Sequence, residues 1–269
     1  MFSIKLGPAG SPEKSTLEGI KKVKELGLQA MEVEFVRGVK MSNDLAKQCG
    51  SEAKKLGIQL SIHAPYFINL ASDEKEKIDA SIKRILDSCE RGHYLGATCV
   101  VFHPAYFGKK TKETVHKMVR DAIIEIQNVI KEKGWKIKLA PETTGKHTTY
   151  GSLEEILQLA EETGCSFCID FAHIYARNRG KIDYKEILDA IEERFKPKHL
   201  HIHFSGIEWT LKGEKNHLII DTNSPPFEPL AKELLERKLS ATIISESPIT
   251  WKDSLRMKEI FEKLGYRFQ

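Results

Sequence analysis

The 269-residue sequence has no long hydrophobic run, no leader-like segment at its amino terminus and few cysteines. No segment approaches eighteen consecutive apolar residues, the length that indicates a membrane-spanning helix, so such a helix is excluded. The first residues lack the basic-then-apolar pattern of a secretory signal, and five cysteines, an odd number, do not indicate a disulfide framework. These absences predict a cytoplasmic protein with no membrane association.

The sequence also lacks a strong excess of charge of either sign. Lys and Arg number 42 against 38 Asp and Glu, a net charge of +4. A surplus this small does not by itself indicate a nucleic-acid partner. Whether the chain binds a nucleic acid has to be inferred from where the charges lie. A nucleotide-binding glycine loop is missing too, because the segment after the first predicted strand, LGPAGS, carries a proline and departs from GxGxxG.

Short β-rich runs alternate with helical patterns along the whole chain. The runs occupy 2–6, 29–35, 58–64, 97–103, 136–142, 165–170, 199–204 and 240–246. Apolar residues at helical spacing fill the intervals, over 15–26, 42–56, 78–86, 111–133, 152–163, 183–195, 226–238 and 253–264. Eight such units with short connections predict an α/β protein with a parallel sheet closed into a single (β/α)8 TIM barrel, one domain over residues 1–269.

Seven consecutive predicted strands end in a residue that can bind a metal ion. These residues are Glu34, His63, His103, Glu142, Asp170, His203 and Glu246. A single histidine at a strand end is more often structural, but the carboxyl ends of barrel strands meet at one mouth, where barrel enzymes place their active sites. Imidazoles with carboxylates and without thiolates favour zinc, manganese or iron over calcium or magnesium. A carboxylate such as Glu142 can bridge two ions about 4 Å apart, the arrangement used for phosphoester hydrolysis.

Other polar residues are predicted to lie in the interior or at the rim, the loops that surround the mouth of the barrel. His201 lies one layer deeper on the same strand face as His203 and is predicted to be a buried, hydrogen-bonded histidine. Cys165 and Cys168 fall on opposite strand faces and are expected to pack in the core. The loops after the strands carry many cations, Arg37, Arg177 and Arg179 among them, with aromatic residues such as Tyr66 between them. This pattern indicates a polyanion at the mouth, with rings that stack on bases.

Several segments together resemble the endonuclease IV family of apurinic/apyrimidinic DNA endonucleases. The matching segments, in family order, are IHAPYFINLAS (62–72), VVFHPA (100–105), APETTG (140–145), CIDFAHIYA (168–176), HIHFSG (201–206) and ISESP (244–248). The resemblance implies a (β/α)8 barrel with a trinuclear zinc cluster that cuts DNA on the 5′ side of an abasic site.

The resemblance also assigns roles to individual residues. It implies that His63, His103 and Glu142 hold one zinc, and that Glu142 bridges to a second zinc. The second zinc would also be bound by Asp170, His203 and Glu246, and a third by His173 and His217. Tyr66 matches an aromatic residue that inserts beside the lesion, and Glu142 is the residue expected to be essential for catalysis.

Two departures from the family pattern bear on the third zinc and on the lesion. The family places an acid two residues before the histidine that matches His217, but this chain has Lys215 there. Either Glu214 takes the place of that acid through a one-residue shift, or water and phosphate complete the shell, or the site stays empty. The loop 35–43 also differs from the DNA-inserting loop of the best-known members. We therefore expect two tightly bound Zn²⁺ ions and a weaker third, with Mn²⁺ as an alternative metal.

The resulting hypothesis is a metal-dependent, monomeric repair enzyme for double-stranded DNA. It would hydrolyse the phosphodiester 5′ to an abasic site and leave a 3′-hydroxyl. A sugar isomerase or epimerase of the xylose-isomerase-like kind is the main alternative, since that class uses a divalent metal at the same strand ends. A protein that binds lesions without cutting is a third possibility. The cation-rich rim and the number of imidazoles favour the nuclease.

Overall fold

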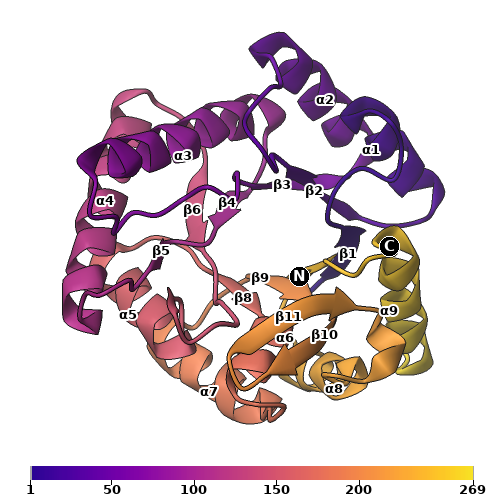
Figure 1. The fold of residues 1–269 in the computed structure, drawn as a ribbon. Coiled ribbons are helices and arrows are strands. Elements are labelled where there is room, and N and C mark those ends of the chain that lie inside the picture. The colour runs from indigo at the N-terminus through magenta and orange to yellow at the C-terminus, as the bar shows by residue number, and fades with distance from the viewer. Residues whose placement is uncertain (1, 269) are drawn as a thin grey trace.

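Eight parallel strands form the centre of the computed structural model, which describes residues 2–268 (Figure 1). They are β1 (Ile4–Pro8), β2 (Ala30–Glu34), β3 (Gln59–His63), β4 (Cys99–Phe102), β6 (Lys138–Pro141), β8 (Cys168–Asp170), β9 (Leu200–Phe204) and β12 (Ala241–Ser245). Each overlaps one of the predicted runs. Nearly all their residues are buried, as expected for a parallel sheet that is covered on its outer face and filled on its inner face.

Hydrogen bonds between neighbouring strands continue around the whole ring. Strand pairing follows the orders β1–β12–β9–β8 and β2–β3–β4–β6. The two halves join where Gln29 N donates to Leu6 O (3.0 Å) on one side and Thr143 N donates to Cys168 O (3.2 Å) on the other. The sheet is therefore closed, and the predicted TIM barrel is confirmed.

A ring of helices alternates with the strands and surrounds the barrel (Figure 1). The helices are α1 (Thr16–Glu25), α2 (Asn43–Leu56), α3 (Lys75–Leu95), α4 (Lys112–Glu132), α5 (Leu153–Thr163), α7 (Tyr184–Phe195), α8 (Phe227–Arg237) and α9 (Trp251–Lys263). Ser42, Thr111, Ser152 and Asp183 cap their helices as predicted, each accepting a backbone N–H from the first turn. Over residues 2–268, none of the helices has the length and apolar character needed to cross a bilayer.

Short elements that the sequence patterns did not predict lie beyond the carboxyl ends of the strands. They are the helix α6 (Phe171–Arg177), the hairpin of β10 (Gly206–Thr210) and β11 (Gly213–Leu218), the two-residue strands β5 (Ala105–Tyr106) and β7 (Thr149–Tyr150), and the 3-10 turn η1 (Ile220–Thr222). The hairpin lies in front of α6 when the barrel is viewed along its axis (Figure 1). These elements complete the mouth of the barrel.

Candidate metal centre

The carboxylate of Glu142 lies at the centre of a group of imidazoles. Glu142 follows β6 directly and is fully buried. Its Oε2 lies 3.3 Å from His63 Nε2 and 3.1 Å from His103 Nε2, and its Oε1 lies 3.2 Å from His203 Nδ1 and 3.3 Å from His173 Nδ1. One carboxylate therefore faces three histidines at strand ends and a fourth, His173, in α6, which is the placement expected of a bridging ligand.

Asp170 and His173 are positioned by the start of α6. Asp170 ends β8 and is also the N-cap of α6, since its Oδ1 accepts the backbone N–H of His173 (2.6 Å). The spacing Asp-x-x-His thus fixes both side chains in one turn. Asp170 Oδ2 is buried without a hydrogen-bond partner and lies 3.6 Å from His173 Nδ1. An unpartnered buried carboxylate oxygen is costly unless a cation or proton satisfies it.

His203 and Glu246 extend the cluster along the next two strands. His203 Nδ1 lies 3.1 Å from Glu246 Oε1, and His203 itself is fully buried. On the opposite side of the ring, His203 Nε2 is 2.8 Å from Glu32 Oε1, although the pair is not aligned as a hydrogen bond. His201 Nε2 donates to Glu32 Oε2 (3.0 Å), which confirms the prediction of a buried, hydrogen-bonded His201.

A β-bulge in the β10–β11 hairpin brings Glu214 into the site. Trp209 pairs with Glu214 and Glu208 pairs with Asn216, so Lys215 is the extra residue of the bulge. Glu214 Oε2 accepts the N–H of Gly145 (2.9 Å) and lies 3.2 Å from His173 Nε2. The bulge thus places Glu214, and not Lys215, beside His173.

The same bulge turns Lys215 away from the cluster. Its Nζ lies 2.7 Å from Glu208 Oε1, and its side chain is 54% exposed. His217 remains on the side of Glu214, with its ring centroid 5.5 Å from that of His173 and its Nε2 4.0 Å from Glu246 Oε2. A spacing of three residues, Glu214 to His217, thereby gives the shared orientation that a regular strand gives at a spacing of two.

Three of the histidines hydrogen-bond one ring nitrogen to a neighbouring residue that is not a candidate ligand, and a fourth turns one toward Glu32. His63 Nδ1 donates to Ala64 O (2.8 Å) and His173 Nδ1 donates to Thr143 O (2.9 Å). His217 Nδ1 lies 2.7 Å from Ser205 Oγ, and His203 Nε2 faces Glu32. Histidines that bind metals have this arrangement, because the outer partner fixes the tautomer and orients the other nitrogen toward the ion. The donor set therefore fits divalent metal ions.

The donors also form groups of the right size for more than one ion. Ligand atoms lie within 4.8 Å of one another in the sets His63, His103, Glu142; His173, His217, Glu246; and Glu142, Asp170, His173, Glu246. A single zinc ion normally takes four ligands, so this many donors exceed what one ion can use. Within residues 2–268, a further set combines Glu32, His203 and Glu246.

Electrostatics in the cluster favour positive charge. Burial lowers the pKa of His63, but the carboxylates of Glu142 and Glu34 outweigh that effect and raise it to about 10. Burial raises the pKa of Glu246, but His203 reverses this and brings it to about 2. Burial alone dominates at Asp170, whose pKa rises to about 6. Divalent ions would supply the positive charge that these carboxylates stabilise, after displacing protons from the imidazoles.

Two residues of this site were missed by the sequence analysis or left without a role. Glu32 lies inside β2, and its carboxylate touches Ser61, His201 and His203. The available signal was a pair of acids, Glu32 and Glu34, two residues apart in an apolar strand and therefore on one face. The role of Ser205, which contacts His217, could not be predicted, because a serine that follows a strand does not by itself indicate a functional site.

Arg177 was expected at the rim, where it would contact DNA, and the structure corrects this. The residue is only 9% exposed. Its Nη1 donates to the carbonyl oxygens of Thr144 (3.2 Å), Lys146 (2.7 Å) and Thr149 (3.2 Å). Because α6 places Arg177 beneath the loop after β6, its guanidinium satisfies backbone carbonyls there. That loop includes Gly145, whose N–H holds Glu214.

Replacing Arg177 with alanine should destabilise the protein. The variant leaves three carbonyl oxygens without their charged donor, and we expect a loss of about 3 kcal/mol in the free energy of unfolding. Arg179→Ala removes the same chemical group from an exposed position and should change the stability by less than about 0.5 kcal/mol. Urea denaturation of both variants measures the difference. Equal losses would show that Arg177 is not a structural residue.

The other residues predicted to contact DNA lie at the surface. Arg37 and Arg179 are exposed, and Tyr66 is 56% exposed, with its ring centroid 6.1 Å from that of His63. Their contact with DNA stays a prediction.

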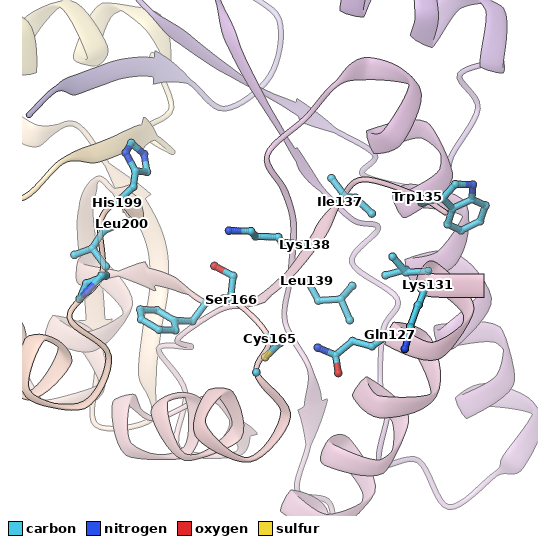
Figure 2. Close-up of a pocket in the computed structure, with 14 residues that line it drawn as sticks. Gln127, Lys131, Trp135, Ile137, Lys138, Leu139, Cys165, Ser166, His199 and Leu200 are labelled. Carbon is cyan, nitrogen blue, oxygen red and sulfur yellow. The ribbon is translucent and has the colours of Figure 1, made fainter. Parts of the chain in front are cut away.

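A separate cavity of about 510 Å³ lies at the opposite end of the barrel (Figure 2). Its walls come from the starts of β6 and β9, from the residues that precede β6, β8 and β9, and from the end of α4, and include Trp135, Lys138, Ser166 and His199. His199 lies 2.8 Å from Thr242 Oγ1, and burial lowers its pKa to about 4. None of the residues predicted for the metal centre lines this cavity.

Comparison with known sequences places the chain in a family of TIM barrels. The model of the family "Xylose isomerase-like TIM barrel" matches residues 20–263. An uncharacterized protein of Methanocaldococcus jannaschii is 36% identical, over 96% of this chain and 97% of that protein. A probable endonuclease 4 of Mycobacterium leprae is 28% identical, but the match spans only 52% of this chain and 56% of the relative.

Solved structures with the same fold carry two kinds of name. Endonuclease IV from Thermus thermophilus superposes with a TM-score of 0.75 at 18% identity, covering 97% of this chain and 98% of that one. A D-tagatose 3-epimerase-like protein superposes with a TM-score of 0.76 at 18% identity, covering 96% of each. At this identity both likenesses establish the fold alone.

Proposed function

Because the chain belongs to the xylose isomerase-like TIM barrel family, we propose that it is a metal-dependent DNA endonuclease that cuts the phosphodiester 5′ to an abasic site and leaves a 3′-hydroxyl. The observation that carries the proposal is the donor cluster around Glu142, which has more imidazoles and carboxylates than one ion can use. The relatives named endonuclease 4 support the same function.

The residues of the cluster would share the ions in a defined way. His63 and His103 would bind one zinc with Glu142, and Asp170, His203 and Glu246 would bind a second with the other oxygen of Glu142. His173, His217 and Glu214 would bind a third. Bound zinc would lower the pKa of an attacking water and neutralise charge on the phosphoryl group.

Protein side chains supply the remaining parts of the reaction. Ala64 O, Thr143 O and Ser205 hold the imidazoles in one orientation, so the ligand positions are set before the substrate arrives. The exposed cations of the rim, Arg37 and Arg179 among them, would attract the phosphate backbone. Tyr66, beside His63, would meet the gap left by the missing base.

A defined duplex tests the proposal. Purified protein with zinc or manganese should nick a duplex that carries one abasic site, and the product should have a 3′-hydroxyl that a polymerase can extend. An undamaged duplex of the same sequence is the control. If the abasic duplex stays intact with every metal tried, the proposal is wrong.

A sugar epimerase is the second candidate, and the D-tagatose 3-epimerase-like structure is the observation that favours it. The exposed cations at the rim argue against it, because neutral sugars have no need of them. Epimerisation of a ketose, together with one tightly bound ion per chain and no nicking, would establish this alternative.

A further inference from the structure

The cavity at the opposite end of the barrel from the metal centre is large enough for a small organic ligand. It has a volume of about 510 Å³ and lies at the amino ends of β6, β8 and β9 (Figure 2). We call it the basal cavity. Sites for small molecules typically have volumes of about 300–1,000 Å³. No residue of the metal centre lines the basal cavity, so it forms a separate site.

Three polar residues line the basal cavity from the same strands that carry candidate metal ligands at their other ends. Each lies four residues before a ligand, and the pairs are Lys138 and Glu142, Ser166 and Asp170, and His199 and His203. Because side chains alternate between the two faces of an extended chain, an even spacing places each pair on one face. These polar residues therefore gather at the amino end of the barrel, about 13 Å from the metal centre, as the ligands gather at its carboxyl end.

The charges around the basal cavity favour an anion. Lys131, from the end of α4, and Lys138 both line it, and within residues 2–268 neither lysine lies within 4.0 Å of a carboxylate oxygen. No Asp or Glu of these described residues is part of its walls. Burial and then nearby positive charges, Lys5 and Lys138 among them, lower the pKa of His199 to about 4, so its imidazole is neutral at neutral pH. Cations without acidic partners attract an anionic ligand.

A chain of hydrogen bonds holds the polar groups at this end of the barrel. Lys5 Nζ donates to Gln59 Oε1 (2.8 Å), and Gln59 Nε2 donates to Thr242 Oγ1 (2.5 Å). Thr242 Oγ1 also lies 2.8 Å from His199 Nε2, which leaves Nδ1 of that ring for a ligand. Groups that are fixed before a ligand arrives lose less entropy when it binds.

The other part of the basal cavity suits a flat ring. Trp135, Ile137 and Gln127 line it, and Figure 2 shows these three on one side of Lys138 and His199 on the other. A planar ring can stack on the indole of a tryptophan, and the side-chain amide of a glutamine can pair with the polar edge of a nucleobase. A ligand with its anionic group at Lys138 would therefore reach Trp135 with its opposite end.

We propose that the basal cavity binds a nucleoside monophosphate, with the phosphate at Lys138, Ser166 and His199 and the base beside Trp135. The inference does not depend on the proposed function, because the cavity and the metal centre share no residue. A hydrogen bond between a lysine and a phosphate contributes enough to change the affinity by about tenfold.

Isothermal titration calorimetry of the 269-residue protein saturated with zinc tests the inference. Adenosine 5′-monophosphate (AMP) should bind at least about tenfold more tightly than adenosine, ribose 5-phosphate or inorganic phosphate, because each of these fills only part of the cavity. Lys138→Gln should weaken the binding of AMP by at least about tenfold. Lys136→Gln makes the same change at an exposed lysine outside the cavity and should leave the affinity unchanged.

A phosphate group can also bind to the ions of a metal centre, and Glu142→Gln distinguishes the two sites. That substitution alters the metal centre and not the basal cavity, so AMP should still bind to the variant. The inference is overturned if AMP does not bind to the wild type, if Lys138→Gln leaves its affinity unchanged, or if Glu142→Gln abolishes its binding. Ribose 5-phosphate that binds as tightly as AMP would also overturn it, since the base would then contribute nothing. None of these results bears on the nicking of abasic DNA, which tests the proposed function separately.

Discussion

The substitution Glu142→Gln should abolish nicking of abasic DNA. Among residues 2–268, Glu142 is the one carboxylate that lies within 3.3 Å of four imidazoles, those of His63, His103, His173 and His203. Glutamine keeps the shape but removes the negative charge and one acceptor, so it could not join the two ions that we propose Glu142 to hold. A loss of several kcal/mol of transition-state stabilisation corresponds to a fall of about 10³-fold or more in kcat/KM.

Steady-state nicking kinetics and elemental analysis on the same preparation measure this effect. Glu208→Gln makes the same chemical change at a partly exposed carboxyl of the hairpin, which pairs with Lys215 outside the cluster, and should keep full activity and metal content. A Glu142→Gln protein that cuts at the rate of the wild type, or that retains all its metal, would contradict the bridging role.

Metal analysis of the wild-type protein should find two tightly bound ions and a third that washes out. The first two ions would be held by ligands from rigid strand ends, with Glu142 between them. The third would depend on Glu214 and His217, both carried by a hairpin outside the barrel wall. Glu214 Oε2 already accepts the N–H of Gly145, which would compete with an ion for that oxygen and weaken the third site.

Single substitutions in the hairpin distinguish the third site from the others. Glu214→Gln and His217→Ala should each lower the affinity for the labile ion by at least about tenfold. That ion is then lost on washing, and two ions per chain remain. Lys215→Gln, the neighbour of Glu214, should change nothing, because the bulge points Lys215 at Glu208. Three equally tight ions that persist in Glu214→Gln would show that the carboxylate is not a ligand.

The barrel and most of the candidate ligands could be predicted from the sequence. A parallel strand buried on both faces reads as a short apolar run, and its helix as a stripe at 3.6-residue spacing, so both signals are local. A polar residue at the end of such a run can be recognised in the sequence, because the other residues of the run are apolar. His63, His103 and Glu142 were found in this way, and the closed barrel brings them to one mouth.

What the sequence could not decide depended on partners far away along the chain. The role of Glu214 follows from a bulge, and a bulge is defined only by how β11 pairs with β10. Arg177 looks like a rim cation in the sequence, but α6 buries it beneath three carbonyl oxygens. Glu32 was hidden inside a strand. Local patterns fix which residues form each strand and helix, whereas the direction and partner of a polar side chain depend on the neighbours that the closed barrel supplies.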